Sequence, residues 1–548
     1  MSNANAASVM AYHERSKHRL ERYAAGPETL DWDAQPDPFR RYAGAATVTL
    51  PLPADGDKTT WRDIFSPGAM PPRPAALASL GLLFELSFAL SAWKELGPDR
   101  WALRCTPSSG NLHPTEVYLV ARGLADLDDG LYHYGPKEHI LERRAAFRHL
   151  DAGTRSPRLL VGLSSIHWRE AWKYGERAFR YCQLDIGHAA GALRYAAAVL
   201  GWRVRPVELE HAALAHLLGL DRDEDFGSAE REEPEALFEL RHTATADIGL
   251  DPAGWMQGAA WSGHANTLDE KPMYRWPVID QVALASRRPT LPLAARASAV
   301  TRELPAGEPA RRLLPSTDVA AATLIRGRRS AQRFDRRARL EVQRFWPLLT
   351  ALMPVYSEGQ AAVPWDVCSA PAGVHALLFT HRIDGLDAGA YLLPRQPAAL
   401  SALQAALPQH AWQRVAASPA DVPLYALARN PALAGTLRTL SCHQAIGANA
   451  MFVVALLAEF RPRIEAAPWR YRELLREAGL IGQTLYLEAE AAGLRGTGIG
   501  CYFDDAVHEL MGLDGSHWQV LYHFSVGLPM LDERITSAPP YSRERVSS

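Results

Sequence analysis

Residues 177–202, RAFRYCQLDIGHAAGALRYAAAVLGW, recur in diverged form at 468–494, PWRYRELLREAGLIGQTLYLEAEAAGL. The two segments align at an offset of 292 residues, which pairs Gly187 with Gly479. In each segment apolar residues recur at three- and four-residue steps until a glycine ends the pattern, and this predicts a long helix. Gly187 and Gly191 would let a second helix approach closely. The repeat indicates two diverged copies of one domain.

Further pairs of segments extend the repeat along the chain. They are HAALAHLLGLD (211–221) with DDAVHELMGLD (504–514), GLYHY (130–134) with GAYLL (389–393), and, faintly, CTPSSGNLHP (105–114) with CSAPAGVHA (368–376). Short β-branched and aromatic runs predict strands at 117–123, 158–163, 366–371 and 518–527. Helices interleaved with a few strands predict an α+β layer fold.

The composition favours a globular enzyme. The chain has 548 residues, of which 47% are hydrophobic and 22% charged, with a formal net charge of −2. This size favours two domains, and the near-neutral charge gives no reason to expect binding to nucleic acid or to an anionic membrane surface. We predict an N-terminal domain over 1–261, a Pro- and Arg-rich linker over 262–320 that could wrap along the surface, and a C-terminal domain over 321–548.

No long uncharged apolar run and no hydrophobic leader are evident, so we expect a cytoplasmic protein without membrane attachment. The five cysteines lie far apart, with neither CxxC nor Cys/His spacing. This pattern argues against a disulfide framework and against a structural metal site.

Several motifs resemble the nitroreductase superfamily. RGRRSAQRFD (326–335), GLRGTGIGCYFDDAVHELMGL (493–513) and LYHFSVGLPMLDERI (521–535) are similar to the opening and closing segments of that superfamily. Four segments of the first copy resemble its SagB-type branch, the flavoenzymes that oxidise azoline rings in peptides to azoles. These are AYHERSKHRL (11–20), LDWDAQPDPFRRY (30–42), RCTPSSGNLHPTEVYLV (104–120) and REAWKYGERAFRYCQLDIGH (169–188).

The resemblance implies two α+β units packed back to back, with FMN in a groove between them. Here the two fused copies would form the pair within one chain, as an intramolecular pseudo-dimer in tandem form. One groove would receive Arg328, Arg329 and Ser330 from the second copy and the loop 107–111 from the first. The opposite groove would have only the poor substitutes WRDIFSPG (61–68) and SAPAGVHA (369–376). We therefore predict one FMN per chain and no metal.

The residue types suit the parts of FMN. Arg328 or Arg329 can grip phosphate oxygens, Ser330 can add a hydroxyl donor, and a helix start at this point would add backbone N–H groups. Alone, this motif would more often be a solvated basic turn. Arg104 would sit as a cation beside the serine-rich loop, whose polar groups can hydrogen-bond the pyrimidine edge of the flavin. The loop consists of Pro107, Ser108, Ser109, Gly110 and Asn111.

The same loop is also ordinary turn chemistry before a strand, and that reading stays open. A second glycine-rich stretch would let the backbone lie close to the ring or the phosphate, although it could equally be a tight helix-to-strand connection. It consists of Gly496, Thr497, Gly498, Ile499 and Gly500.

Lys173 and Tyr174 match the Lys-Tyr pair that the resemblance implicates in proton removal. Oxidation of a substrate C–H bond sends hydride to the flavin while a base takes a proton, and a partly desolvated Lys suits that role. The alternative is a helix face on which Lys173 is solvated and Tyr174 packs in the core.

The leading hypothesis is an FMN-dependent oxidoreductase that oxidises a peptide-derived or other heterocyclic substrate. It could work beside a cyclodehydratase in a modifying complex. One alternative is a reductase that takes hydride from NAD(P)H and reduces nitroaromatic, quinone or enone substrates. Another is a non-catalytic scaffold that has kept the fold and lost the flavin.

Overall fold

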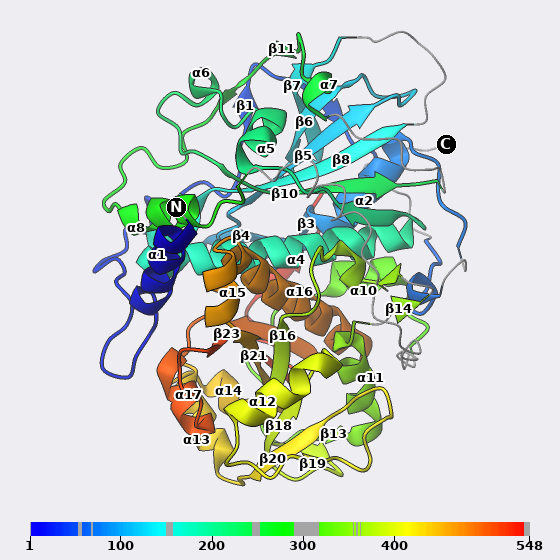
Figure 1. Ribbon diagram of the computed structural model, residues 1–548. Coiled ribbons are helices and arrows are strands. Elements are labelled where there is room, and N and C mark those ends of the chain that lie inside the picture. Colours follow the sequence, from blue (N-terminus) through cyan, green and yellow to red (C-terminus); the bar gives the residue numbers. More distant parts are fainter. Residues whose placement is uncertain are drawn as a thin grey trace.

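The computed structural model describes residues 2–52, 57–66, 70–148, 157–243, 252–289, 317–354, 356–357, 360–361 and 363–541. Two antiparallel sheets form its outer parts, and two long helices lie side by side between them (Figure 1). The helices are α4 (Ala178–Val199) and α16 (Arg470–Ala491), each of 22 residues.

Each half of the chain contributes one large sheet. In spatial order, the first is β11 (Ala260–Trp261), β7 (Ile140–Ala146), β6 (Gly130–Gly135), β5 (Thr115–Arg122), β8 (Arg158–Ser165), β10 (Glu233–Arg241) and β9 (Arg203–Pro206), with β2 (Ala46–Thr49) also on β7. The second is β19 (Gln413–Arg414), β20 (Tyr425–Arg429), β18 (Gly389–Leu393), β16 (Val374–Thr380), β21 (Phe452–Glu459), β23 (Trp518–Gly527) and β22 (Arg495–Ile499).

The two sheets share one topology over five neighbouring strands. The order β6-β5-β8-β10-β9 of the first sheet corresponds to β18-β16-β21-β23-β22 of the second. The long helix also occupies the same place in both halves, because α4 lies between β8 and β9 in the chain and α16 lies between β21 and β22. The predicted fold class, two α+β units paired within one chain, is confirmed.

Glycines let α4 and α16 touch backbone to backbone. A Cβ at Gly187 would lie 2.0 Å from the Arg476 carbonyl oxygen, and one at Gly479 would lie 2.0 Å from the Leu184 carbonyl oxygen. The close approach predicted for Gly187 is therefore confirmed. Gly191 faces side chains instead, with a Cβ there 2.8 Å from Leu480.

The smaller helices surround this frame. In the first half they are α1 (Ser2–Arg15), α2 (Leu77–Ser87), α3 (His167–Tyr174), α5 (His211–Leu218), α6 (Asp223–Phe226), α7 (Pro252–Trp255) and α8 (Pro277–Ala285). In the second half they are α10 (Ala321–Gly327), α11 (Val342–Leu352), α12 (Leu400–Ala406), α13 (Leu433–Leu440), α14 (Ala445–Asn449), α15 (Arg461–Ala466) and α17 (Asp504–Met511).

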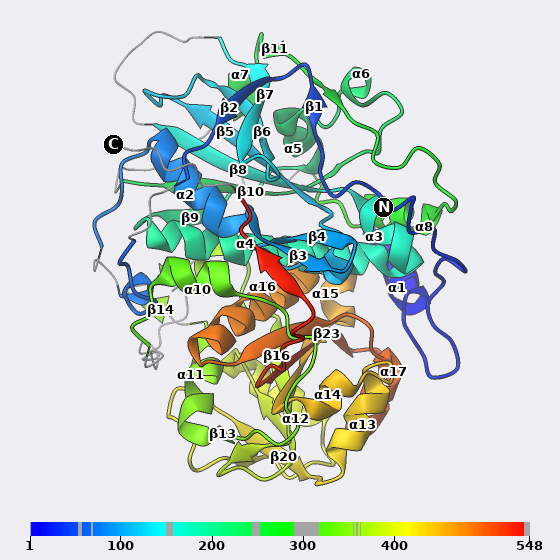
Figure 2. The ribbon, with the colours of Figure 1, turned by 180° about the vertical axis from the view of Figure 1, so that it is seen from behind.

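Small sheets add further connections. The two-stranded ones pair β1 (Tyr42–Ala43) with β12 (His264–Ala265), β13 (Leu340–Glu341) with β17 (Ile383–Asp384), and β14 (Tyr356–Ser357) with β15 (Gln360–Ala361). In a three-stranded sheet, β24 (Thr536–Ala538) pairs with β3 (Leu90–Leu96), which pairs with β4 (Asp99–Arg104). The C-terminal strand of the second half therefore lies on the first half, as Figure 2 shows from behind.

Most of the predicted strands are present. The runs at 117–123, 158–163 and 518–527 correspond to β5, β8 and β23. The strand predicted at 366–371 is wrong, since Trp365–Val367 forms a short 3-10 turn and β16 begins only at Val374. Pro371 lacks the N–H that a strand ladder needs, and the segment is a loop ahead of the strand.

The predicted linker contains ordered structure. Within 262–320, α8 buries Ile279, Val282 and Ala283 and packs against α1 and α4. Residues 290–316 of the linker lie outside the described residues. Among the described helices, none combines the length and the apolar character that crossing a bilayer requires.

Candidate functional site

A cavity of about 760 Å³ lies between the two halves, and we call it the main cavity. Its walls come from the loop between β4 and β5, from α4, from the segment after α10, from β22 and from the chain between β23 and β24. It is lined by every predicted cofactor-binding residue except Gly496, namely Arg104, Pro107, Ser108, Ser109, Gly110, Asn111, Arg328, Arg329, Ser330, Thr497, Gly498, Ile499 and Gly500. The size is typical of a small-molecule site.

Five cations line the main cavity: Lys94, Arg104, Arg328, Arg329 and Arg495. Burial and the charges of Arg329 and Arg495 lower the pKa of Lys94, so these three cations lie close enough to repel one another. Three acidic residues also line the cavity, Asp185, Asp532 and Glu533, and Glu490 pairs with Arg495 at 3.3 Å. The net positive charge suits an anionic group such as a phosphate.

Arg328 is buried and hydrogen-bonded, but one of its N–H groups has no partner among the described residues. It is 3% exposed, and its Nε and Nη2 donate to the carbonyls of Cys105 and Arg104 at 3.0 and 3.1 Å. Its Nη1 has no hydrogen-bond partner among the described residues. A buried donor without a partner is costly, so a ligand acceptor would complete this guanidinium.

The predicted helix start at Arg328 is wrong. The helix α10 ends at Gly327, and Arg328 has extended dihedral angles (φ −56°, ψ 126°). Arg329 instead donates to the carbonyls of Arg326 and Arg328, both at 2.7 Å, and so binds carbonyls at the C-terminal end of α10. Basic side chains are favoured at this end of a helix, and the N-terminal dipole contribution expected here is absent.

Tyr486 connects Ser330 to the glycine-rich strand β22 through two hydrogen bonds. The Ser330 hydroxyl lies 2.9 Å from the Tyr486 hydroxyl, which accepts the Gly498 N–H at 3.0 Å. A Cβ at Gly498 would lie 1.6 Å from the Tyr522 hydroxyl. The glycine is therefore required by a tyrosine of the protein itself, and not only by close approach of a ligand.

The serine-rich loop has positive φ at two residues, and some of its side chains already form hydrogen bonds within the protein. Gly110 and Asn111 have positive φ of 60° and 61°. The Asn111 amide donates to the Ala102 carbonyl at 2.8 Å, and the Ser108 hydroxyl lies 3.4 Å from Glu170 Oε1. These side-chain bonds hold the loop in shape, so its remaining polar groups face the main cavity in a fixed arrangement.

Of the predicted pair Lys173 and Tyr174, only Tyr174 is among the residues described as lining the main cavity. Tyr174 lines the main cavity, and a Cβ at Gly110 would lie 2.5 Å from its hydroxyl. The Lys173 Nζ lies 5.3 Å from the centre of the Trp32 ring and 5.6 Å from that of Tyr174, and Lys173 is not among the residues described as lining the cavity. Burial raises the pKa of Tyr174 well above its ordinary value, so its hydroxyl keeps its proton.

The sequence analysis missed a buried carboxyl pair, Asp185 and Glu170. Asp185 lines the main cavity and accepts the Ser109 N–H at 3.4 Å, while its Oδ2 and Glu170 Oε2 have no partner among the described residues. Burial raises the pKa of Asp185 to about 7, and burial together with the nearby Asp185 raises that of Glu170 well above its ordinary value. The pair therefore holds a proton at neutral pH. A signal was available, because Asp185 aligns with the acidic Glu477 of the second copy.

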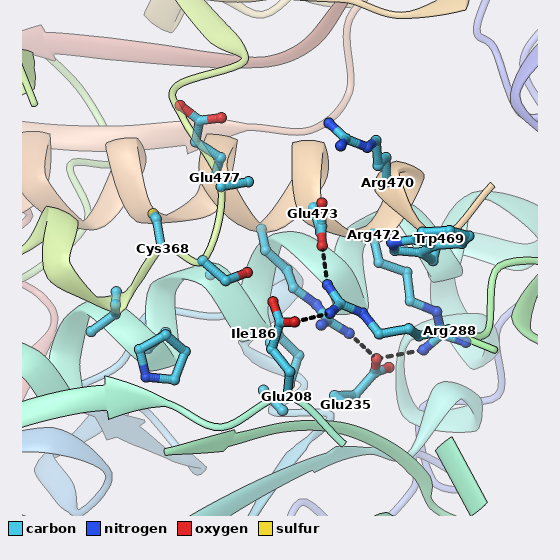
Figure 3. Close-up of a pocket in the computed structure, with 18 of the residues that line it drawn as sticks. Ile186, Glu208, Glu235, Arg288, Cys368, Trp469, Arg470, Arg472, Glu473 and Glu477 are labelled. Atoms are coloured by element: carbon cyan, nitrogen blue, oxygen red, sulfur yellow. Dashed lines mark hydrogen bonds and ion pairs between the residues drawn. The ribbon is translucent and has the colours of Figure 1, made fainter. Parts of the chain in front are cut away.

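The opposite groove, called here the second groove, is smaller and filled by ion pairs. Its cavity measures about 200 Å³ and is lined by residues of both α4 and α16, among them Gly187 and Leu480. Arg288 enters it and binds Glu208 at 2.5 Å and Glu473 at 2.6 Å, while Arg472 binds Glu235 at 2.6 Å (Figure 3). The cations that line this groove are thus largely neutralised by protein carboxylates.

The two substitutes predicted for the second groove have different positions. Residues 369–371 and 373 line it, at the place that the serine-rich loop takes in the main cavity. Trp61, in contrast, is fully buried, stacks on Tyr195 at 5.3 Å and is not among the residues described as lining either space. Among the described residues, none of 61–66 lines the second groove, where Ser286, Arg287 and Arg288 lie instead, and residues 67–68 of the predicted substitute fall outside the described residues.

Comparisons with known proteins agree with this architecture. Residues 325–528, which lie in the second half, match the model of the nitroreductase family. A protein of Methanocaldococcus jannaschii described as a nitroreductase is 28% identical over 130 residues, which are 22% of this chain and 64%, less than two thirds, of that relative.

A solved structure from Anabaena variabilis, also described as a nitroreductase, aligns over 95% of this chain and 99% of its own with a TM-score of 0.68 at 20% identity, which establishes the fold alone. A chain of the E. coli microcin synthetase complex aligns over 46% of this chain and 95% of its own, with 16% identity and a TM-score of only 0.25.

Proposed function

We propose that this chain is an FMN-dependent oxidoreductase with a single flavin site, the main cavity. The observation that carries the proposal is the meeting, in one cavity, of Arg328, Arg329 and Arg495 of the second half with Lys94 and the serine-rich loop of the first. The complete set of cations requires both halves. The comparisons support the coarser statement, since residues 325–528 match the model of a family of oxidoreductases that typically bind flavin.

The donor set fits FMN. Lys94, Arg328, Arg329 and Arg495 would hold the phosphate, with Ser330 as a further donor. The unpartnered buried donors Arg328 Nη1 and Arg104 Nε each require an acceptor that the described residues do not supply. When bound, FMN would supply hydride transfer.

The chain's own residues would handle the proton. The Asp185–Glu170 pair holds a proton beside the serine-rich loop, and Tyr174 presents a protonated hydroxyl in the same wall. The Lys173 Nζ lies 5.6 Å from the centre of the Tyr174 ring, and in this proposal it receives the substrate proton by way of the Tyr174 hydroxyl.

For the substrate class, we propose a SagB-type dehydrogenase that oxidises a peptide-derived azoline or a related heterocycle. The support is the position of Tyr174 in the cavity wall with Lys173 next to it, as the resemblance to that branch requires. A cyclodehydratase, which makes azolines, is the matching partner. An NAD(P)H-dependent reductase and a flavin-free scaffold are the alternatives: flavin quantification tests the scaffold, and anaerobic mixing separates the reductase from the dehydrogenase.

The first experiment is a visible spectrum of the purified chain with released flavin quantified against protein. We expect one FMN per chain, because the second groove is filled by Arg288 and its carboxylates. Lys94→Ala combined with Arg495→Ala should weaken FMN binding at least about tenfold, since charge-assisted bonds contribute about 1.5–3 kcal/mol each. The matched control is Arg470→Ala, which removes a cation from the second groove and should leave affinity unchanged.

Release of two FMN per chain would contradict a single flavin site. A chain that takes up no added FMN would favour the non-catalytic scaffold. Anaerobic mixing then distinguishes the enzymes: bleaching by a synthetic thiazoline peptide supports the dehydrogenase, and rapid bleaching by NADPH supports the reductase.

Lys173→Ala and Asp185→Asn together identify the proton acceptor. We expect Lys173→Ala to abolish reduction of the flavin by the thiazoline peptide while FMN stays bound. Asp185→Asn should retain part of that rate and remove a pH dependence centred near 7, because the ionised form of the pair gains population as pH rises through that value. Stopped-flow absorbance from pH 5 to 9 measures both. Unchanged reduction in Lys173→Ala would remove Lys173 from the mechanism.

A further inference from the structure

Two of the five cysteines, distant in sequence, meet beside the main cavity. Cys442 lies in the turn after α13, and Cys501 follows β22 and lines the cavity. The two thiols lie within interaction range, since each is the leading cause of the shift in the other's pKa. The Phe503 N–H donates to the Leu440 carbonyl at 2.9 Å, which fastens the two segments together. Both thiols are free and half-buried.

Cys442 lies in a strained stretch of backbone. Its φ is +50° and that of His443 is +60°, a region that non-glycine residues rarely adopt. Such strain persists only where the surroundings enforce it, and it is common at functional sites.

His18 presents a ring N–H group to Cys501. Its Nδ1 accepts the Ala24 N–H at 2.9 Å, so in the neutral ring the proton must be on Nε2. Burial lowers the pKa of His18, so the ring is neutral at neutral pH. His18 lowers the pKa of Cys501, and Nε2–H is the ring donor left to face that thiol.

A fixed positive charge stands on the other side of Cys501. The Arg177 guanidinium donates to the Gly500 carbonyl at 2.9 Å, one residue before the thiol. Cys442 and His18, together with Arg177, hold the pKa of Cys501 below its ordinary value against the effect of burial. Cys501 is therefore the thiolate of the pair, and Cys442 retains its proton.

We propose that Cys442 and Cys501 form a redox-active thiol pair in the wall of the main cavity, which hydrogen peroxide converts to a reversible disulfide. The Cys501 thiolate attacks one peroxide oxygen, the O–O bond breaks, and sulfenic acid and hydroxide form. The Cys442 sulfur then attacks the sulfenic sulfur, a disulfide forms, and water leaves with the Cys442 proton. A dithiol reductant reverses the change.

Oxidation would join two parts of the cavity wall covalently, since both Cys501 and Gln444, two residues after Cys442, line the cavity. The chemistry needs no bound flavin. A failure of this proposal and a failure of the proposed function are therefore distinguishable.

The test uses the reduced full-length chain, treated with one equivalent of hydrogen peroxide and then alkylated under denaturing conditions. We expect non-reduced peptide mapping by mass spectrometry to find Cys442 linked to Cys501, with Cys105, Cys182 and Cys368 alkylated. The pair should react at least about tenfold faster than Cys368, a half-buried cysteine of the second groove whose thiol pKa burial raises.

Three variants assign the roles. Cys442→Ser should accumulate sulfenic acid at Cys501, which dimedone traps, Cys501→Ser should give no adduct, and the matched control Cys368→Ser should cross-link like the parent. Full alkylation of Cys442 and Cys501 in the peroxide-treated parent, or oxidation no faster than that of Cys368, would overturn the proposal.

Discussion

Gly479→Ala is expected to destabilise the chain by about 3 kcal/mol or more, the upper end for overpacking of a core. The added methyl would lie 2.0 Å from the Leu184 carbonyl oxygen and 2.9 Å from its carbon, which are backbone atoms of α4. No side-chain rotation relieves this contact, so α4 and α16 must move apart and lose packing along their length. Urea unfolding, followed by circular dichroism, measures the change.

The matched control is Gly435→Ala. This glycine also lies inside a helix, α13, but it is exposed, and a Cβ there meets nothing within 4 Å. Because Ala is favoured over Gly in a helix by about 0.8–1 kcal/mol, the control should be slightly stabilised. Equal effects at the two positions would show that the helices do not pack as closely as described.

Asp504→Ala is expected to cost about 3–5 kcal/mol, the range for breaking a buried ion pair from one side. The Asp504 side chain is fully buried and accepts hydrogen bonds from Arg177 at 3.0 Å and Arg180 at 2.8 Å. It also accepts the His18 N–H at 3.0 Å. The substitution leaves two buried guanidinium groups of the first half without their carboxylate from the second.

The control is Asp384→Ala, which removes one partner of an ion pair whose side chains are both about half exposed, Arg339 with Asp384. Exposed pairs contribute about 0–1 kcal/mol, so its unfolding midpoint should barely move. A loss for Asp504→Ala as small as that of the control would contradict the role assigned to the buried pair.

The ion pairs of Asp504 with Arg177 and Arg180 also make the stability of the fold depend on pH. Burial acts to raise the pKa of Asp504, but Arg177 and Arg180 outweigh it and hold that pKa well below its ordinary value. A carboxyl with a depressed folded-state pKa contributes stability that is fully present above its unfolded value, about 3.9, and is lost as pH falls below it. Asp504→Ala should therefore have a flatter stability profile on the acid side than the parent chain.

Part of the site could be predicted from the sequence, because its motifs consist of residues that are adjacent in the chain. The Arg328–Ser330 motif and the loop 107–111 were each recognisable as polar segments, and both line the main cavity. The helix start at Arg328 was predicted wrongly, since only the fold reveals that α10 precedes it and ends at Gly327. Lys94 gave no local signal, and Arg495 was not singled out within the motif 493–513, because each lies in a strand whose neighbours in space come from elsewhere in the chain.

The sequence by itself determined that the chain is a doubled α+β unit with a close helix pair, because a repeat and a helical period are short-range patterns written along one segment. Only the tertiary structure decided which residues share a wall: Asp185 with Ser109, Cys442 with Cys501, and Arg288 with Glu473. The physical reason is that a contact between distant segments depends on how the sheets and helices pack, and packing is a property of the whole fold rather than of any one segment.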